Sequence, residues 1–137
     1  MPCPFFEPQR RTGAPAYAQA RLPLIDEYEG LCHAGDSPET PPDSVRFRCC
    51  NHGYSRAACA RFPQIEERSA LRYSVIRETV ETLQVLCIEE RDHIPAPAAT
   101  VRFDLATSTL LANELTFLMQ AQALAFCRSY ADRFLRT

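Results

Sequence analysis

The fold of this 137-residue chain is decided by two short runs, LRYSVIR at Leu71–Arg77 and TLQVLCIE at Thr82–Glu89. The first run alternates and is rich in β-branched and aromatic residues. The second places Leu83, Val85 and Cys87 on one face with a period of two, which is typical of a strand with one buried face. We therefore expect an antiparallel hairpin that turns near residues 78–81. A helix over 80–89 is the competing interpretation, because Glu and Leu tolerate both states.

The residues that follow the hairpin extend it into a meander. Ile94-Pro95-Ala96-Pro97 predicts a break, because proline removes a backbone donor. Thr100–Leu105 then reads as a third strand, and Thr107–Ser108 as a polar turn.

The C-terminal segment, from about Asn113 to Arg136, contains neither proline nor glycine and predicts a long helix capped by Asn113. Its apolar residues recur at helical spacing, which is typical of an amphipathic helix packed on a core. These residues are Phe117, Leu118, Ala121, Leu124 and Ala125.

The N-terminal half, residues 1–63, has a different composition and holds nine of the eleven prolines and five of the seven cysteines. Proline restricts the backbone conformation of its own residue and of the preceding one, so long helices or strands are not expected here. Residues 37–43 predict an open surface loop, and one short helix is expected over 54–61 with Asn51 as its N-cap. Such a loop-rich segment buries too little apolar surface to offset its ordering entropy, so we expect a metal centre to hold it together.

The predicted fold class is therefore α+β, in one domain spanning 1–137. Residues 1–63 form a Pro/Cys-rich loop module around a metal centre. Residues 64–112 form a small antiparallel β-meander, and residues 113–137 form the long C-terminal helix.

Composition excludes several classes of protein. Fifteen basic residues, all arginine, balance 17 acidic ones, which argues against binding nucleic acid or membranes by bulk charge. Without lysine, Schiff-base and P-loop chemistry are excluded. No apolar run approaches the roughly 20 residues of a membrane span. The first residues lack a signal-peptide pattern, so we expect a cytoplasmic protein, in which seven cysteines indicate metal binding or catalysis rather than disulfides.

The candidate ligands lie in loops bounded by proline or glycine. Cys3 stands between two prolines, Cys32 lies in GLCHAG at 30–35, Cys49 and Cys50 precede a glycine turn, and Cys59 lies near the end of the predicted short helix. Four such thiols can converge on one centre. Their spacing differs from the compact C-x2-C runs of ferredoxins and zinc ribbons.

The pattern Cys50-Asn-x-Gly-Tyr-x-Arg-x-x-Cys59-x-Arg-Phe-Pro, with Gly-x-Cys32-x-Ala-Gly upstream, resembles small bacterial proteins described as iron–sulfur-cluster-binding. The resemblance covers residues 1–63 and extends loosely to the strand region. It implies that Cys3, Cys32, Cys50 and Cys59 ligate a [4Fe–4S] cluster, with Cys49 as the alternative to Cys50. The roles of these proteins are poorly defined. For a chain that holds such a cluster, our first hypothesis is electron transfer or sensing of redox state or iron, with a redox partner protein and no catalysis by the chain itself.

Two other functions remain open. Zinc at the same four cysteines would make the centre structural, and the sheet or helix would bind a partner protein. A thiol redox enzyme using the adjacent Cys49 and Cys50 is less favoured, because neighbouring cysteines rarely form an unstrained disulfide.

The remaining polar and cysteine residues receive simpler assignments. Cys87 and Cys127 are expected in the core. His33 and His52 adjoin predicted ligands, and we expect them to support the site or to be surface residues. Four arginines are expected near the ligands, where they either compensate the charge of a cluster or form a solvated face: Arg46, Arg48, Arg56 and Arg61. We expect two groups of acidic residues at the surface. The first is Asp26, Glu27 and Glu29, and the second is the charged run EERD at residues 89–92.

Overall fold

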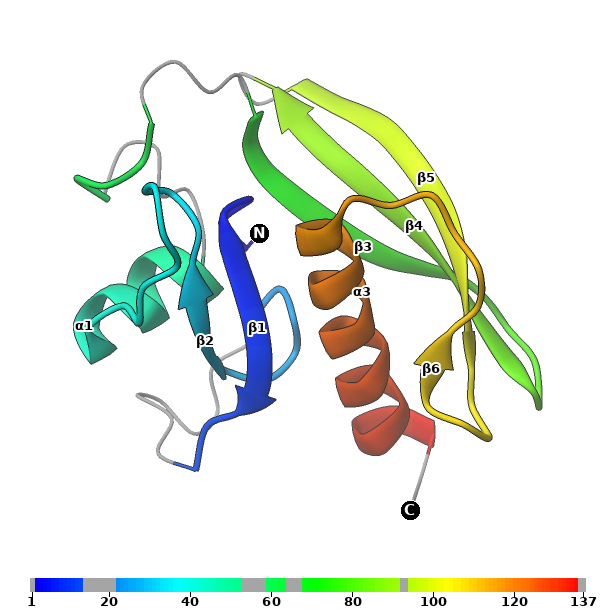
Figure 1. Cartoon of the computed structure of the whole chain (residues 1–137). Coiled ribbons are helices and arrows are strands. Elements are labelled where there is room, and N and C mark those ends of the chain that lie inside the picture. Colours follow the sequence, from blue (N-terminus) through cyan, green and yellow to red (C-terminus); the bar gives the residue numbers. More distant parts are fainter. Residues whose placement is uncertain (1, 14–21, 53–58, 64–67, 92–93, 136–137) are drawn as a thin grey trace.

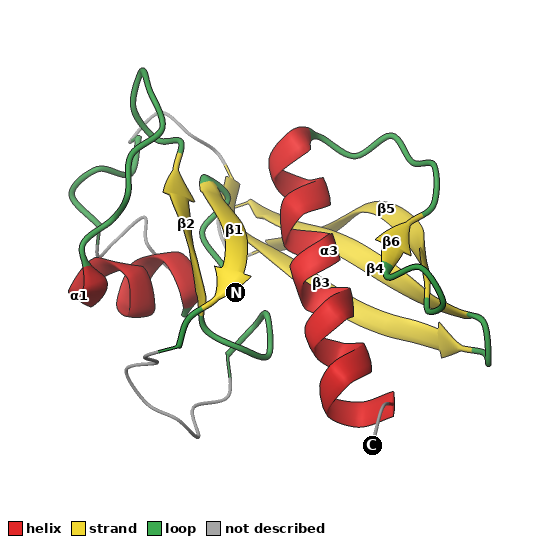
Figure 2. Cartoon of the chain, turned by 60° about the horizontal axis from the view of Figure 1, so that its bottom comes forward, coloured by secondary structure: helices red, strands yellow, loops and turns green. Residues whose placement is uncertain are grey.

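The computed structural model describes residues 2–13, 22–52, 59–63, 68–91 and 94–135. It combines antiparallel sheets with a long C-terminal helix, as the sequence predicts. The helix α3 (Phe117–Tyr130) lies between a two-stranded sheet and a four-stranded sheet, and the turned view shows the same order (Figures 1 and 2). None of the helices in the described ranges is long and apolar enough to cross a membrane.

The four-stranded sheet is a meander of β3 (Arg68–Glu78), β4 (Thr82–Arg91), β5 (Ile94–Asp104) and β6 (Thr109–Leu110) in chain order. The predicted hairpin is confirmed: β3 and β4 pair antiparallel, with Tyr73 opposite Cys87. The Thr79 hydroxyl accepts a hydrogen bond from the Thr82 amide at 2.9 Å and closes the turn. Leu83, Val85 and Cys87 are fully buried, so the helical interpretation of this segment is wrong.

The predicted break at 94–97 is also wrong, because β5 begins at Ile94 and runs through both prolines. Pro95 lies opposite Glu90 and Pro97 opposite Ile88 in the pairing with β4. Strand β6 pairs only with the last two residues of β5, so the proline-containing half of β5 is an edge. Proline is tolerated at an edge because no further strand needs its missing N–H group.

The helix α3 begins later than the sequence predicts. Its N-cap is Thr116, whose side chain accepts from the Met119 amide, whereas the Asn113 side chain accepts from the Leu115 amide at 3.0 Å in a turn before the helix. Beyond Tyr130 the chain continues as the π-helix η2 (Ala131–Leu135).

The buried face of α3 differs from the predicted one. Phe117 is 63% exposed, and Leu118, Ala121 and Leu124 are only half-buried. Because α3 packs between two sheets, much of its circumference is covered, and its fully or nearly fully buried residues include polar ones. Among them are Met119, Gln122, Ala123, Phe126, Cys127 and Ser129.

The N-terminal half contains more regular structure than the sequence predicts. Strand β1 (Phe6–Arg11) pairs antiparallel with β2 (Tyr28–Cys32), and a single helical turn α1 (Asp43–Val45) leads directly into the π-helix η1 (Arg46–Asn51). Both strands are short, which is compatible with the many prolines between and around them. Of the surface loop predicted over 37–43, residues 37–40 are exposed as expected, whereas Pro41 is buried and Asp43 begins α1.

Asn51, the predicted N-cap, is the last residue of η1 and is fully buried. Its side-chain amide accepts from the Tyr28 amide at 2.8 Å and donates to the Tyr28 and Arg46 carbonyls, both at 3.0 Å. Asn51 therefore fastens η1 to β2. Most of the predicted helix over 54–61 lies outside the described residues.

The acidic residues Asp26 and Glu27 are buried, at 7% and 5% exposure, and not at the surface as predicted. Glu27 pairs with Arg46 of η1 at 2.8 Å. Asp26 lies between Arg11 of β1, at 3.4 Å, and Arg133 of η2. Asp26 thus connects β1 with η2, whereas Glu27 fastens η1 to the segment before β2. Removing one partner of a buried pair is strongly destabilising. Glu90 of the other acidic run is also buried, at 7% exposure.

Candidate metal centre

Four of the five cysteines in the N-terminal half are buried, and Cys59 is half-buried; all five are free thiols. Cys3 precedes β1, Cys32 ends β2, and Cys49 and Cys50 lie in η1. The Cys3 amide donates to the Cys50 carbonyl at 3.1 Å. The start of the chain is therefore attached to the helix that carries Cys49 and Cys50.

The strand pairing brings Cys3 and Cys32 into the same region. Phe6, three residues after Cys3, lies opposite Cys32 in the β1–β2 pair. The Phe6 amide donates to the Cys3 carbonyl at 3.0 Å, which makes a tight turn just before the strand. Two buried prolines, Pro2 and Pro4, flank Cys3 and restrict its backbone.

A buried glutamine fixes this turn against the core. The Gln122 side chain of α3 donates to the Cys3 and Phe6 carbonyls at 2.7 and 2.8 Å, and accepts from the Tyr73 hydroxyl of β3 at 3.0 Å. Neither the role of Gln122 nor that of Asn51 is predicted from the sequence. A lone amide in a helix or a loop carries no pattern that distinguishes it from a surface residue.

Electrostatic interactions show which thiols are neighbours. Burial raises the pKa of the Cys50 thiol well above its ordinary value, and the charges of Cys3, Cys32, Cys59 and Cys49 raise it further. Burial also raises the pKa of Cys49, which in addition interacts with Cys59 through a hydrogen bond. Cys50 thus has all three other predicted ligands around it.

The thiols are not gathered on a single point. Within the described ranges, no group of three or more His, Cys, Asp or Glu side chains is arranged to hold a metal ion. The thiols of the predicted ligands therefore interact through Cys50, and the described side chains do not present a closed tetrahedral site in which four thiolates share one ion at about 2.3 Å.

The two described histidines make contacts outside the cysteine group. His33 Nε2 lies 2.8 Å from the Glu7 carboxylate, so this nitrogen is already engaged. His52 is exposed, with its ring centroid 6.3 Å from that of Phe47. His93 lies outside the described residues.

Of the arginines predicted near the cysteines, two form ion pairs with carboxylates and one interacts with a thiol. Arg46 pairs with Glu27 and Asp43, and Arg61 pairs with Glu39 at 2.7 Å. Arg48 lies close enough to Cys49 that its charge favours the thiolate. Arg56 falls outside the described residues.

Comparison with known protein families, curated proteins and solved structures finds no match. The function of this chain is therefore inferred from its own residues.

The two remaining cysteines lie in the core, as predicted. Cys87 of β4 and Cys127 of α3 are both fully buried. Burial raises the pKa of each thiol to about 12 from an ordinary value of 9.0, and Cys87 contributes to the shift of Cys127. These thiols are apolar parts of the core and are separate from the N-terminal group.

The shifted pKa values of Cys87 and Cys127 predict a pH dependence of stability. Above about pH 9 the thiols of the unfolded chain lose protons, whereas the folded thiols keep theirs up to about pH 12. Below pH 9 they contribute no pH dependence. Between about pH 9 and pH 12 we expect the free energy of unfolding to fall by about 1.4 kcal/mol per pH unit for each thiol.

Urea unfolding measured at pH 8, 9.5 and 10.5 tests this expectation, with a Cys87→Ala, Cys127→Ala double variant as the comparison. The double variant should lose less stability over this range than the wild type. An equal loss in both proteins would mean that the two thiols ionise as readily in the folded protein as in the unfolded chain.

Proposed function

We propose that this chain binds a [4Fe–4S] cluster through Cys3, Cys32, Cys50 and Cys59, and acts as a non-catalytic electron-transfer or redox- or iron-sensing protein of the cytoplasm. The observation that carries the proposal is the buried Cys50 thiol with all three other predicted ligands as electrostatic neighbours. The resemblance of the cysteine pattern to iron–sulfur-cluster-binding proteins supports the same assignment.

A bound cation would offset the cost of ionising the buried Cys50 thiol. A buried thiolate without a counter-charge is unfavourable, and the neighbouring thiols make it more so. Iron removes this penalty because it binds thiolates and supplies positive charge among them. Five free thiols in one neighbourhood are therefore better accounted for by a bound metal group than by five separate core residues.

The resemblance of the cysteine pattern is the reason to prefer a cluster over a single zinc ion. Four thiolates that share one zinc must converge on one point, whereas in a [4Fe–4S] cluster each thiolate binds a different iron. The described side chains form no group arranged to hold a metal ion, so the metal content decides between the two.

Cys50 is favoured over Cys49 as the third ligand. The thiols of Cys3, Cys32 and Cys59 all act on Cys50, whereas Cys49 interacts mainly with Cys59. The backbone bond from Cys3 to the Cys50 carbonyl also fixes the position of Cys50 relative to another ligand.

When bound, the cluster would supply the one-electron chemistry, and the chain would set its potential by burial, charge and hydrogen bonding. Arg48 precedes Cys49, the neighbour of the proposed ligand Cys50, and its charge favours the Cys49 thiolate. A nearby positive charge favours the more reduced, more negative cluster and so raises its potential. Half-buried Cys59 lies nearest to solvent among the four ligands, which gives a redox partner protein its shortest approach.

The test is the content of iron, zinc and acid-labile sulfide per chain after anaerobic purification. We expect about four iron and four sulfide, with the broad visible absorption of a cluster. One zinc without sulfide would replace this proposal with the zinc-stapled interaction module. Metal-free protein that also fails to take up iron and sulfide on reconstitution would overturn both.

A further inference from the structure

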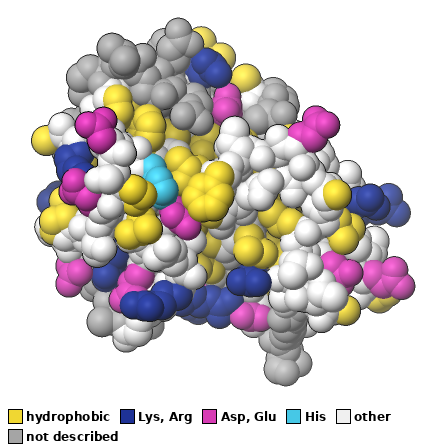
Figure 3. All heavy atoms as spheres, viewed as in Figure 1, with side chains coloured by type: hydrophobic (Ala, Val, Ile, Leu, Met, Phe, Trp, Pro, Cys, Tyr) yellow, Lys and Arg dark blue, Asp and Glu magenta, His cyan; other side chains and the backbone are white. Residues whose placement is uncertain are grey.

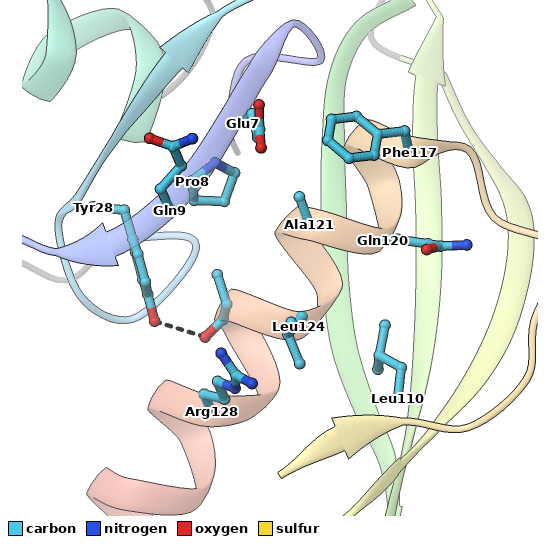
Figure 4. A pocket seen from close by; sticks show the side chains of 11 residues that line it. Glu7, Pro8, Gln9, Tyr28, Leu110, Phe117, Gln120, Ala121, Leu124 and Arg128 are labelled. Atoms are coloured by element: carbon cyan, nitrogen blue, oxygen red, sulfur yellow. Dashed lines mark hydrogen bonds between the residues drawn. The ribbon is translucent and has the colours of Figure 1, made fainter. Parts of the chain in front are cut away.

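The exposed face of α3 carries a stripe that the cysteine site does not use. Phe117, Ala121, Leu124 and Arg128 follow one another at helical spacing. The sequence predicts the apolar part of this stripe as core, yet it faces an open groove of about 440 Å³ (Figure 4). Strand β1, with Pro8, forms one wall of the groove, and Leu110 of β6 contributes to the other. Binding sites for small organic molecules have volumes of about 300–1,000 Å³.

The groove stays open because its floor is made of small residues. Ala121 and Ala125 leave space that larger side chains would fill. Tyr28 lines the groove, but its hydroxyl is fully engaged, since it donates to the Ala125 carbonyl at 2.8 Å and contacts the Ser129 hydroxyl (Figure 4). This wall is therefore fixed in place.

The apolar lining of the groove is partly exposed to solvent. Phe117 is 63% exposed, and Ala121, Leu124 and Leu110 are half-buried. The space-filling view shows hydrophobic side chains exposed on this face of the molecule (Figure 3). Covering such surface is favourable by about 25 cal/mol per Å². An apolar ligand body would therefore gain affinity along the stripe.

The two ends of the groove differ in charge. In Figure 4, Glu7 and Phe117 lie at one end and Arg128 at the other. Glu7 is already bound to His33 at 2.8 Å. Arg128 Nε donates to the Ser108 carbonyl at 3.1 Å, and no carboxylate pairs with this guanidinium within the described part of the chain. Its outer N–H groups thus remain for a planar anion, which guanidinium binds in a bidentate manner.

We propose that this groove binds an elongated organic carboxylate, with its carboxylate on Arg128 and its apolar body along Ala121, Leu124 and Phe117. The formal net charge of the chain is −2, so bulk charge does not attract anions. Affinity for the anion must then come from Arg128 itself. The proposal is independent of the metal centre, because no cysteine lines the groove.

The test uses decanoate as the probe, measured by isothermal titration calorimetry and by displacement of the fluorescent anion 1-anilinonaphthalene-8-sulfonate. We expect one site, with decanoate binding at least about tenfold more tightly than decylamine. Arg128→Gln should weaken decanoate binding by roughly tenfold or more, and Ala121→Phe should abolish it by filling the groove.

The matched control is Arg72→Gln, since Arg72 is an exposed arginine on β3, the strand at the opposite edge of the sheet from β6. It should bind decanoate as the wild type does. Circular dichroism establishes whether each variant is folded. If Ala121→Phe does not fold, Arg128→Gln alone decides the test. Absence of decanoate binding up to about 1 mM, or equal binding by Arg128→Gln and the wild type, would overturn the proposal.

Discussion

Replacing Cys50 with serine is expected to reduce the iron content of the anaerobically purified protein from about four atoms per chain to nearly none. Cys50 is the proposed ligand whose thiol interacts with those of Cys3, Cys32 and Cys59, and serine keeps its size while removing the thiolate. Cys59→Ser should have the same effect. Iron, sulfide and visible absorption, measured together, report the loss.

Two variants control for the general effect of removing a cysteine. Cys87→Ala changes a fully buried thiol of β4, outside the N-terminal group, and should keep the iron. Cys49→Ser changes the neighbour of Cys50 in η1 and should also keep it, because Cys49 interacts mainly with Cys59. Loss of iron in Cys49→Ser with retention in Cys50→Ser would exchange the two assignments. Full iron and sulfide in both Cys50→Ser and Cys59→Ser would disprove the cluster site.

Gly30→Ala is expected to destabilise the protein by about 3 kcal/mol and to lower its iron content. A Cβ atom at Gly30 would lie 1.9 Å from the Glu7 carbonyl oxygen and 2.8 Å from the Glu7 carbonyl carbon. Both are backbone atoms of β1, so β1 itself would have to move away from β2. That movement would separate the segments that carry Cys3 and Cys32.

Gly13→Ala is the matched control, because a Cβ atom there would meet nothing within 4 Å. Its free energy of unfolding should stay within about 0.5 kcal/mol of the wild type. Urea unfolding compares the two variants whether or not metal is bound. Equal stability of Gly30→Ala and Gly13→Ala would show that β1 and β2 do not approach each other as described.

The meander could be predicted from sequence because its signal is local. In β4 the period-two placement of Leu83, Val85 and Cys87 corresponds directly to the buried face of a sheet. The break expected at Pro95 failed for a tertiary reason. Whether a proline interrupts a strand depends on whether another strand needs its N–H group, and β6 is too short to do so.

The predicted face of α3 failed for a related reason. Sequence periodicity identifies which residues share a face but not which face meets a neighbour. Because sheets pack on both sides of α3, buried positions extend to Gln122 and Ser129, and the apolar stripe that ends in Phe117 is left along the groove. Likewise Asp26 and Glu27 read as surface residues, and only the approach of Arg11, Arg46 and Arg133 allows them to be buried.

The sequence by itself determined the α+β class, the hairpin with its turn, the existence of the C-terminal helix, and the core positions of Cys87 and Cys127, because each follows from the periodicity or composition of a short segment. Only the tertiary structure decided which thiols are neighbours. Cys3, Cys32 and Cys50 lie far apart in the chain, and they meet through the β1–β2 pairing and the bond from Cys3 to Cys50. Contacts between distant segments depend on how elements pack, and no local pattern records them.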